Sequence, residues 1–188
     1  MVTFLYALPV LSVVLLGAAR LLEIFAKREG VIRGPVRENL TFRLFMLTGA
    51  VVAGGSILEY LFLWHGFSWI VFALGWVLGV LSFWIRRAAI AALGKFWSLH
   101  VEIRENHEFV KSGPFGLVRH PVYFSMILEL LAFAAVCNAW IVALLIPLIF
   151  VPVLMMRVRM EEAAMIEKFG SAYEEYRRTT PAIFPRLW

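Results

Sequence analysis

Long runs of apolar residues, separated by shorter polar pieces, dominate the chain. Five such runs stand out, at residues 4–24, 40–64, 69–85, 121–136 and 139–156. About 20 apolar residues are needed for an α-helix to cross a bilayer, and the fourth run is short for a full crossing. The pattern predicts an all-α, multi-pass integral membrane protein with about five transmembrane helices.

The polar connections between these runs differ in charge. With five crossings, the first loop, the long segment 86–120 and the tail from Arg157 onward fall on one side of the membrane, and all three are basic. The short turns at 65–68 and at Asn138 contain no Lys or Arg. Because cytoplasmic connections carry an excess of Lys and Arg, we expect the N-terminus outside, the C-terminus in the cytoplasm and a functional site at the cytoplasmic face.

The composition excludes several other classes of protein. Hydrophobic residues make up 62% and charged residues 16% of the chain, which is too apolar for an ordinary soluble domain. The net charge of +5 lies between apolar segments rather than along one exposed stripe, so we expect no nucleic-acid partner. Cys137 is the single cysteine, and no Cys and His residues have zinc-ligand spacing, so we expect no metal site.

Small residues recur at helical spacing inside two of the runs. Gly75 with Gly79, and Gly49 with Ala53, are each four residues apart. Such pairs let neighbouring membrane helices approach closely, so we expect a packing role for both.

The long polar segment contains an unusual concentration of chemically capable side chains. His100, His107 and His120 occur here with aromatic residues and Arg119, just before the fourth run begins at Pro121. Proline is favoured in the first turn of a helix, and the free N–H groups of a helix start bind anionic or carboxylate groups. The segment therefore predicts a binding site at the membrane surface.

The tail after the fifth run continues as a predicted helix. Arg157 and Glu161 are four residues apart and share one face of it. Gly170 is expected to end this helix, and Ser171 to Glu174 has the form of a capping box that starts another. Four further residues are expected to fold the tail back towards the membrane: Tyr173, Tyr176, Pro181 and Pro185.

Simpler interpretations of these residues stay open. Arg157 and Glu161 are also what a snorkelling pair at the end of a span looks like, and the histidines are also typical of membrane interfaces. Glu59 and Glu129 lie within apolar runs, where a carboxylate is costly and is either functional, protonated or paired across helices. No role is assigned to these two.

Taken together, the motifs resemble the isoprenylcysteine carboxyl methyltransferase family and its phospholipid-methylating relatives. The matching pieces are His107-Glu108-Phe109-Val110, Ser112-Gly113-Pro114-Phe115, Arg119-His120-Pro121-Val122-Tyr123, Arg157, Glu161-Glu162, Phe169-Gly170, Tyr173, Tyr176 and Pro185. They occur in the family's order within residues 94–188, whereas the first spans match only as spans. The resemblance implies two parts, residues 1–93 with three spans and a methyltransferase-like catalytic region over 94–188 with two spans and C-terminal cytoplasmic helices.

The resemblance also implies an activity and a site. The expected reaction is methyl transfer from S-adenosylmethionine to a lipophilic acceptor, foremost the carboxylate of an isoprenylcysteine-like molecule, with the substrate and membrane lipids as partners. Arg157 and His120 are the expected catalytic residues, and Arg157 is also the expected acceptor-binding residue. Phe115 stands where the family commonly has tyrosine. The expected cofactor-binding residues are His100, His107, Glu108, Phe109, Val110, Phe115, His120, Pro121, Val122, Tyr123 and Glu161.

Two other functions remain as alternatives. Sterol reductases that use NADPH have similar elements near their C-termini, although they are typically longer and would need further basic residues for the dinucleotide phosphates. A non-catalytic membrane bundle or a small transporter is the second alternative. The sequence does not choose between a carboxylate, a phenol and an amine as methyl acceptor, but a phenol or an amine would need a base such as His120.

Overall fold

The chain folds into a bundle of helices in a computed structural model that describes residues 2–26, 39–63, 66–97 and 110–186. Four helices are long and apolar enough to cross a membrane, and α4 is a shorter apolar helix. The prediction of an all-α, polytopic membrane protein is confirmed. The elements are α1 (Val2–Phe25), α2 (Leu40–Phe62), α3 (Trp69–Leu93), η1 (Gly94–Phe96), η2 (Gly113–Gly116), α4 (Pro121–Val136), α5 (Trp140–Phe169) and α6 (Ser171–Thr179).

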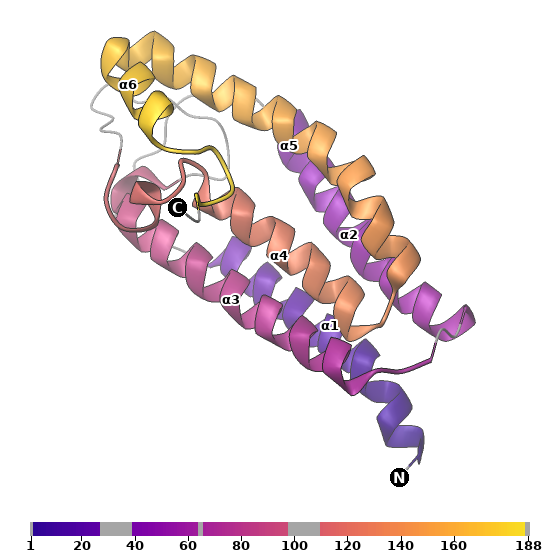
Figure 1. Ribbon diagram of the computed structural model, residues 1–188. Coiled ribbons are helices and arrows are strands. Elements are labelled where there is room, and N and C mark those ends of the chain that lie inside the picture. Colours follow the sequence, from indigo (N-terminus) through magenta and orange to yellow (C-terminus); the bar gives the residue numbers. More distant parts are fainter. Residues whose placement is uncertain (1, 27–38, 64–65, 98–109, 187–188) are drawn as a thin grey trace.

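Successive long helices run in alternating directions between the two ends of the bundle (Figure 1). Helices α1, α3 and α4 lie together, and α2 lies beside α5. The N-terminus is at one end, whereas α6 and the segment after it fold over the other end, close to the start of α4. The two polar segments predicted to carry chemistry therefore meet at one end of the bundle.

Two helices are longer than the apolar runs that predicted them. The fifth continues through the polar stretch to Phe169, as expected, but α3 extends to Leu93 although the run ends at residue 85. Placing Arg86 in a polar loop was wrong. Arg86 is a buried residue of α3, and its guanidinium lies 2.7 Å from Glu23 Oε2 and 2.8 Å from Glu129 Oε2, so ion pairs across helices replace its hydration.

The predicted packing role holds for Gly75 and Gly79 but not for Gly49. A Cβ atom on Gly75 would lie 2.7 Å from Val136, and one on Gly79 would lie 2.9 Å from Leu16, so no larger residue fits there without rearrangement. A Cβ atom on Gly49 would have no neighbour within 4 Å, because Gly49 lines a cavity. Ala53 lines the same cavity and also packs against the hydrophobic core.

The helix ends follow the predicted turn residues with one exception. Asn138 and Gly170 both adopt a positive φ of 53°, which ends α4 and α5 sharply. The predicted capping box is wrong, because Gly170 is the N-cap of α6 and Ser171 is already its first helical residue, with no side-chain cap.

Glu59 joins α2 to the start of α5. No role was assigned to this residue from the sequence. Its carboxylate is buried, and its two oxygens accept hydrogen bonds from the backbone N–H groups of Ile141 at 2.9 Å and Val142 at 2.8 Å. These N–H groups are in the first turn of α5 and have no partner within that helix. Glu59 thus acts as a helix cap provided by a neighbouring helix.

Replacing Glu59 with leucine is expected to destabilise the protein, because it leaves two N–H groups without their acceptor at a cost of about 1–3 kcal/mol each. Thermal unfolding in detergent would measure the loss. Glu59→Gln keeps one oxygen acceptor and serves as the control, with a smaller decrease in Tm. An unchanged Tm in Glu59→Leu would contradict the capping role.

Candidate functional site

The entry to α4 is held in place by the segment that follows α6. Pro121 occupies the first turn of α4, as predicted. The backbone N–H of Arg119 donates to the carbonyl of Pro181 at 2.9 Å, and that of His120 donates to the carbonyl of Ala182 at 2.8 Å. Two pieces of chain about 60 residues apart therefore fix one another by main-chain hydrogen bonds.

The side chain of Arg119 ties the same entry to α5 and α6. Its Nη2 lies 2.6 Å from Glu162 Oε1, and its Nη1 donates to the carbonyl oxygens of Arg177, at 2.9 Å, and of Thr180. A guanidinium that makes several bonds in fixed directions is a rigid clamp. The start of α4 is thus positioned against the C-terminal half of α5.

The centre of the site is a hydrogen-bonded group from three helices. Tyr123 of α4 donates its hydroxyl hydrogen to Glu161 Oε1 of α5. Arg157, one turn earlier on α5, donates from Nε to Glu161 Oε1 at 2.9 Å and to the Tyr123 hydroxyl at 3.1 Å. Its Nη1 donates to Thr41 Oγ1 of α2 at 2.8 Å. Arg157 is 3% exposed, so this is a buried charge held in one orientation rather than a snorkelling side chain.

His120 connects the centre of the site to the Arg119 clamp. Its Nε2 lies 3.1 Å from Glu162 Oε1 and its Nδ1 lies 3.6 Å from Glu161 Oε2, while its ring stacks on Tyr123 with centroids 5.5 Å apart. Burial favours the neutral imidazole, but the hydrogen bonds to Glu161 and Glu162 outweigh it, so the pKa of His120 is raised.

This raised pKa predicts that stability decreases with increasing pH. Because the folded pKa exceeds the unfolded one, the imidazolium contributes stability that is complete below about pH 6.5 and is lost as the pH rises through the folded value. The Tm in detergent should fall across that window, and His120→Gln should flatten the dependence. The same pH dependence in both proteins would contradict the assignment.

A cavity of about 440 Å³ opens from this group into the bundle. Its polar end is lined by Arg119, His120, Tyr123, Arg157 and Glu161. An apolar limb, lined mainly by α1, α2, α4 and α5, leads away from that end. The limb residues include Gly17, Leu21, Phe45, Met46, Gly49, Ala50, Ala53, Met126, Leu130, Phe133 and Phe150. A single space therefore joins buried charges to an apolar region within the membrane-spanning helices.

All eight predicted site residues that the structure describes line this cavity, namely Val110, Phe115, His120, Pro121, Val122, Tyr123, Arg157 and Glu161. The others, His100, His107, Glu108 and Phe109, lie outside the described residues. Phe115 is buried, and its carbonyl accepts a hydrogen bond from the Tyr176 hydroxyl at 2.5 Å. Burial raises the pKa of Tyr176 to about 12, so this hydroxyl stays a neutral donor.

Several residues in or beside the cavity were not among the predicted site residues. Thr41 holds Arg157, and Glu162 joins Arg119 to His120. Arg20 and Glu129 line the apolar limb. Glu162 carried a signal as part of the Glu161-Glu162 motif, and Glu129 carried one as a carboxylate within an apolar run. Thr41 and Arg20 carried none, because the sequence does not reveal which helices are neighbours.

Within residues 2–26, 39–63, 66–97 and 110–186, no group of three or more His, Cys, Asp or Glu is placed to hold a metal ion. The charged residues of the site are instead paired with one another. The expectation that the reaction uses no metal stays a prediction.

Comparisons with known proteins show a similarity to one family and to individual proteins, including two curated relatives. The profile of the isoprenylcysteine carboxyl methyltransferase family matches residues 71–167. The chain is 34% identical to a cobalt-zinc-cadmium resistance protein of Cupriavidus metallidurans over 53% of this chain and 46% of the relative. It is 30% identical to the protein-S-isoprenylcysteine O-methyltransferase of Schizosaccharomyces pombe over 61% of this chain and 49% of the relative. The matches thus span about half the length of these curated relatives.

Proposed function

Because this chain belongs to the isoprenylcysteine carboxyl methyltransferase family, we propose that it transfers a methyl group from S-adenosylmethionine to a lipophilic acceptor, foremost the carboxylate of a prenylated thioether. The observation that carries the proposal is the single cavity that joins the Tyr123, Arg157 and Glu161 group to an apolar limb. A water-soluble methyl donor and a lipid-dissolved acceptor must meet in such a place.

The polar end of the cavity suits the methyl donor in size and chemistry. Ligand pockets for molecules of this size typically hold about 300–1,000 Å³, and this cavity holds about 440 Å³. The Glu161 carboxylate is an acceptor for the donor's ammonium group. The faces of Tyr123 and Phe115 are suited to a sulfonium, because aromatic faces attract cations. The residues present therefore fit S-adenosylmethionine.

Arg157 is the residue best placed to hold an acceptor carboxylate. It lies between the Glu161 carboxylate and Thr41 of α2, where the polar end passes into the apolar limb. A guanidinium pairs with a carboxylate through two parallel hydrogen bonds, which fixes both its position and its direction. A prenyl or acyl chain would then extend along the limb past Phe45 and Gly49.

The chemistry needs little beyond alignment. The acceptor oxygen forms a bond to the donor's methyl carbon while the carbon–sulfur bond breaks, and an ionised carboxylate loses no proton in this step. Arg157 would orient the oxygen, and burial would exclude water, so positioning and desolvation account for most of the rate. A phenol or amine acceptor would require a proton to be removed, and His120 is the nearest candidate base.

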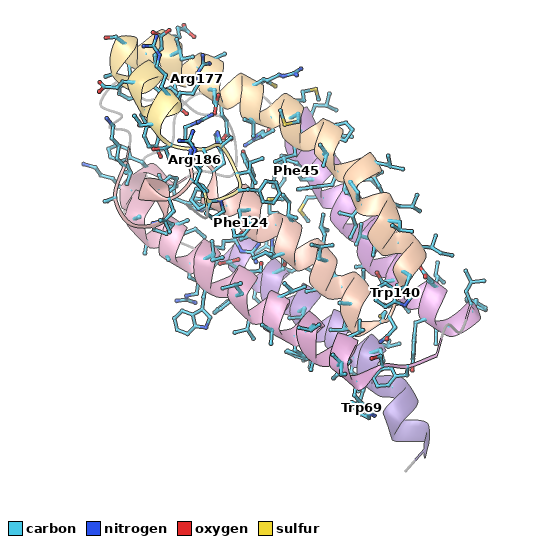
Figure 2. The ribbon with its side chains drawn as sticks, viewed as in Figure 1. Phe45, Trp69, Phe124, Trp140, Arg177 and Arg186 are labelled. Carbon is cyan, nitrogen blue, oxygen red and sulfur yellow. The ribbon has the colours of Figure 1, made fainter. Side chains whose placement is uncertain are left out.

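The polar end of the bundle is proposed to face the cytoplasm. Figure 2 shows Trp69 and Trp140 at one end, where α3 and α5 begin, and Arg177 and Arg186 at the other end, above the site. Tryptophan is enriched at membrane interfaces, and Lys and Arg are enriched on the cytoplasmic side. This distribution supports access to the site from the compartment that holds the methyl donor.

The direct test incubates the purified protein with S-adenosylmethionine labelled on its methyl group and with membrane lipids or a prenyl thioether carboxylate. Mass spectrometry should detect a base-labile methyl ester, and calorimetry should detect binding of S-adenosylhomocysteine. Binding of NADPH instead, without binding of the nucleoside, would favour a reductase and overturn the proposal.

The apolar limb offers a second prediction. Replacing Gly49 with leucine should reduce acceptor turnover by about tenfold or more, because the side chain would occupy the limb, while affinity for S-adenosylhomocysteine changes little. The substitution meets no atom within 4 Å at its Cβ and should not destabilise α2. Steady-state kinetics with a prenyl acceptor would measure the effect.

Gly54→Leu is the matched control for this prediction, since Gly54 lies on α2, is equally uncrowded and does not line the cavity. Equal turnover in Gly49→Leu and the wild type would show that the acceptor does not use this limb.

A further inference from the structure

The apolar limb contains two charged residues that the proposed reaction does not use. Arg20 of α1 and Glu129 of α4 both line it. Arg20 Nη1 lies 3.1 Å from Glu23 Oε2, and Arg20 Nε lies 3.5 Å from Glu129 Oε2. Charged side chains within membrane-spanning helices are costly and usually serve a function.

The same carboxylates also pair with Arg86, which does not line the cavity. Arg86 is 2% exposed, with Nε 2.7 Å from Glu23 Oε2 and Nη1 2.8 Å from Glu129 Oε2. The four residues form a group of two arginines and two glutamates with no formal net charge. Arg86 explains why Glu23 and Glu129 are buried, but it does not explain why Arg20 and Glu129 face the limb.

Two polar atoms of the cavity-lining residues in this group make no hydrogen bond. Among the described residues, no hydrogen bond is made by Nη2 of Arg20 or by Oε1 of Glu129, whereas Nη1 of Arg20 and Oε2 of Glu129 each make one. The side chains of Arg20 and Glu129 are 19% and 12% exposed, and both line the cavity. A donor and an acceptor without partners in an otherwise apolar space favour a ligand that offers the complementary pair.

We infer that Arg20 and Glu129 bind an uncharged hydrogen-bonding group, such as an amide, within the chain of the methyl acceptor; this inference rests on the proposed function. A charged group is disfavoured, because an anion would meet the Glu129 carboxylate and a cation would meet the Arg20 guanidinium. An amide offers both an acceptor for Nη2 and a donor for Oε1.

The position of this pair sets the spacing of the acceptor. Glu129 follows Tyr123 by six residues on α4, which corresponds to about 9 Å along the helix axis. The limb continues beyond it to Phe133 and Phe150. The preferred acceptor therefore has a carboxylate at the Arg157 end, an amide about 9 Å away and hydrocarbon beyond the amide.

The test uses two prenyl thioether carboxylates of equal length, one with an amide about 9 Å from the carboxylate and one with methylenes in its place. Direct binding of the radiolabelled compounds to the purified protein in detergent gives the affinities. The wild type should bind the amide compound roughly 10- to 100-fold more tightly, the range expected for hydrogen bonds to charged groups.

Changing Arg20→Leu together with Glu129→Leu should abolish that preference. This double variant removes the unpartnered donor and acceptor but leaves Arg86 with Glu23, so the buried charges stay balanced. Arg87→Leu on α3 is the control, because Arg87 is exposed and lies outside the cavity, and it should keep the preference. If the double variant does not fold, Arg20→Lys, which keeps the charge but lacks Nη2, should show a reduced preference.

Equal affinity of the wild type for the two compounds, or an unchanged preference in a folded double variant, would overturn the inference. Binding of S-adenosylhomocysteine tests the proposed function separately. If the protein prefers the amide compound but does not bind the nucleoside, the proposed methyl transfer is wrong and the Arg20 and Glu129 site stands. If it binds the nucleoside but shows no preference, the proposed methyl transfer stands and the Arg20 and Glu129 site is wrong.

Discussion

Replacing Glu161 with glutamine is expected to weaken the binding of S-adenosylhomocysteine by roughly 10- to 100-fold, the worth of a hydrogen bond to a charged group. The substitution preserves the size of the side chain but removes the charge that would pair with the ligand's ammonium. It also weakens the hydrogen bonds that Arg157 and Tyr123 donate to Glu161 Oε1, because the acceptor is no longer charged. Isothermal titration calorimetry in detergent would measure the change.

Glu167→Gln is the matched control, because Glu167 is on the same helix, is exposed and does not line the cavity. It should bind the nucleoside as the wild type does. Wild-type affinity in a folded Glu161→Gln variant would remove Glu161 from the proposed cofactor site.

Arg157→Lys is expected to lower kcat/KM for a carboxylate acceptor by about 100-fold, with little change in affinity for S-adenosylhomocysteine. Lysine keeps the positive charge beside Glu161 but does not reproduce the guanidinium's paired hydrogen bonds. The oxygen that receives the methyl group would then lose its fixed direction, and misalignment is costly in a reaction that depends on positioning. Steady-state kinetics at saturating methyl donor would separate the two effects.

Arg159→Lys is the control for this substitution, since Arg159 is exposed two residues further along α5. Its kinetics should match those of the wild type. A decrease in nucleoside affinity as large as the decrease in kcat/KM would instead place Arg157 in the cofactor site rather than the acceptor site.

The membrane-spanning helices were predictable from the sequence because lipid selects for long apolar runs. Four of the five runs became helices long enough to cross, and the short fourth run is the short helix α4. The error in the length of α3 arose where charge is balanced inside the bundle. Arg86 interrupts the apolar run, yet two carboxylates from other helices allow α3 to continue past it.

The meeting of the two polar segments was also predictable, because an odd number of crossings brings them to one end. The hydrogen bond between Tyr123 and Glu161 confirms that these segments share one cavity. The contributions of Thr41 and Arg20 were not predictable. Which helices are neighbours depends on side-chain packing over the whole bundle, and a single sequence does not record that arrangement.

The two glutamates within apolar runs illustrate the same limit. Both were recognised as costly, and both are paired across helices, but with different partners. Glu59 accepts from the backbone at the start of α5, whereas Glu129 belongs to a group of ion pairs beside the cavity. Hydropathy identifies a carboxylate within an apolar run, but only the fold reveals which groups bind it.

The main-chain hydrogen bonds between the start of α4 and the segment after α6 join parts of the chain that are synthesised at different times. Residues 181 and 182, whose carbonyls accept hydrogen bonds from the N–H groups of Arg119 and His120, are synthesised after helices α1 to α5. The pocket is therefore complete only after these helices have been made. Helices α1 to α5 alone would lack the segment that fixes the start of α4, and we expect ligand binding only once residues 181 and 182 have docked.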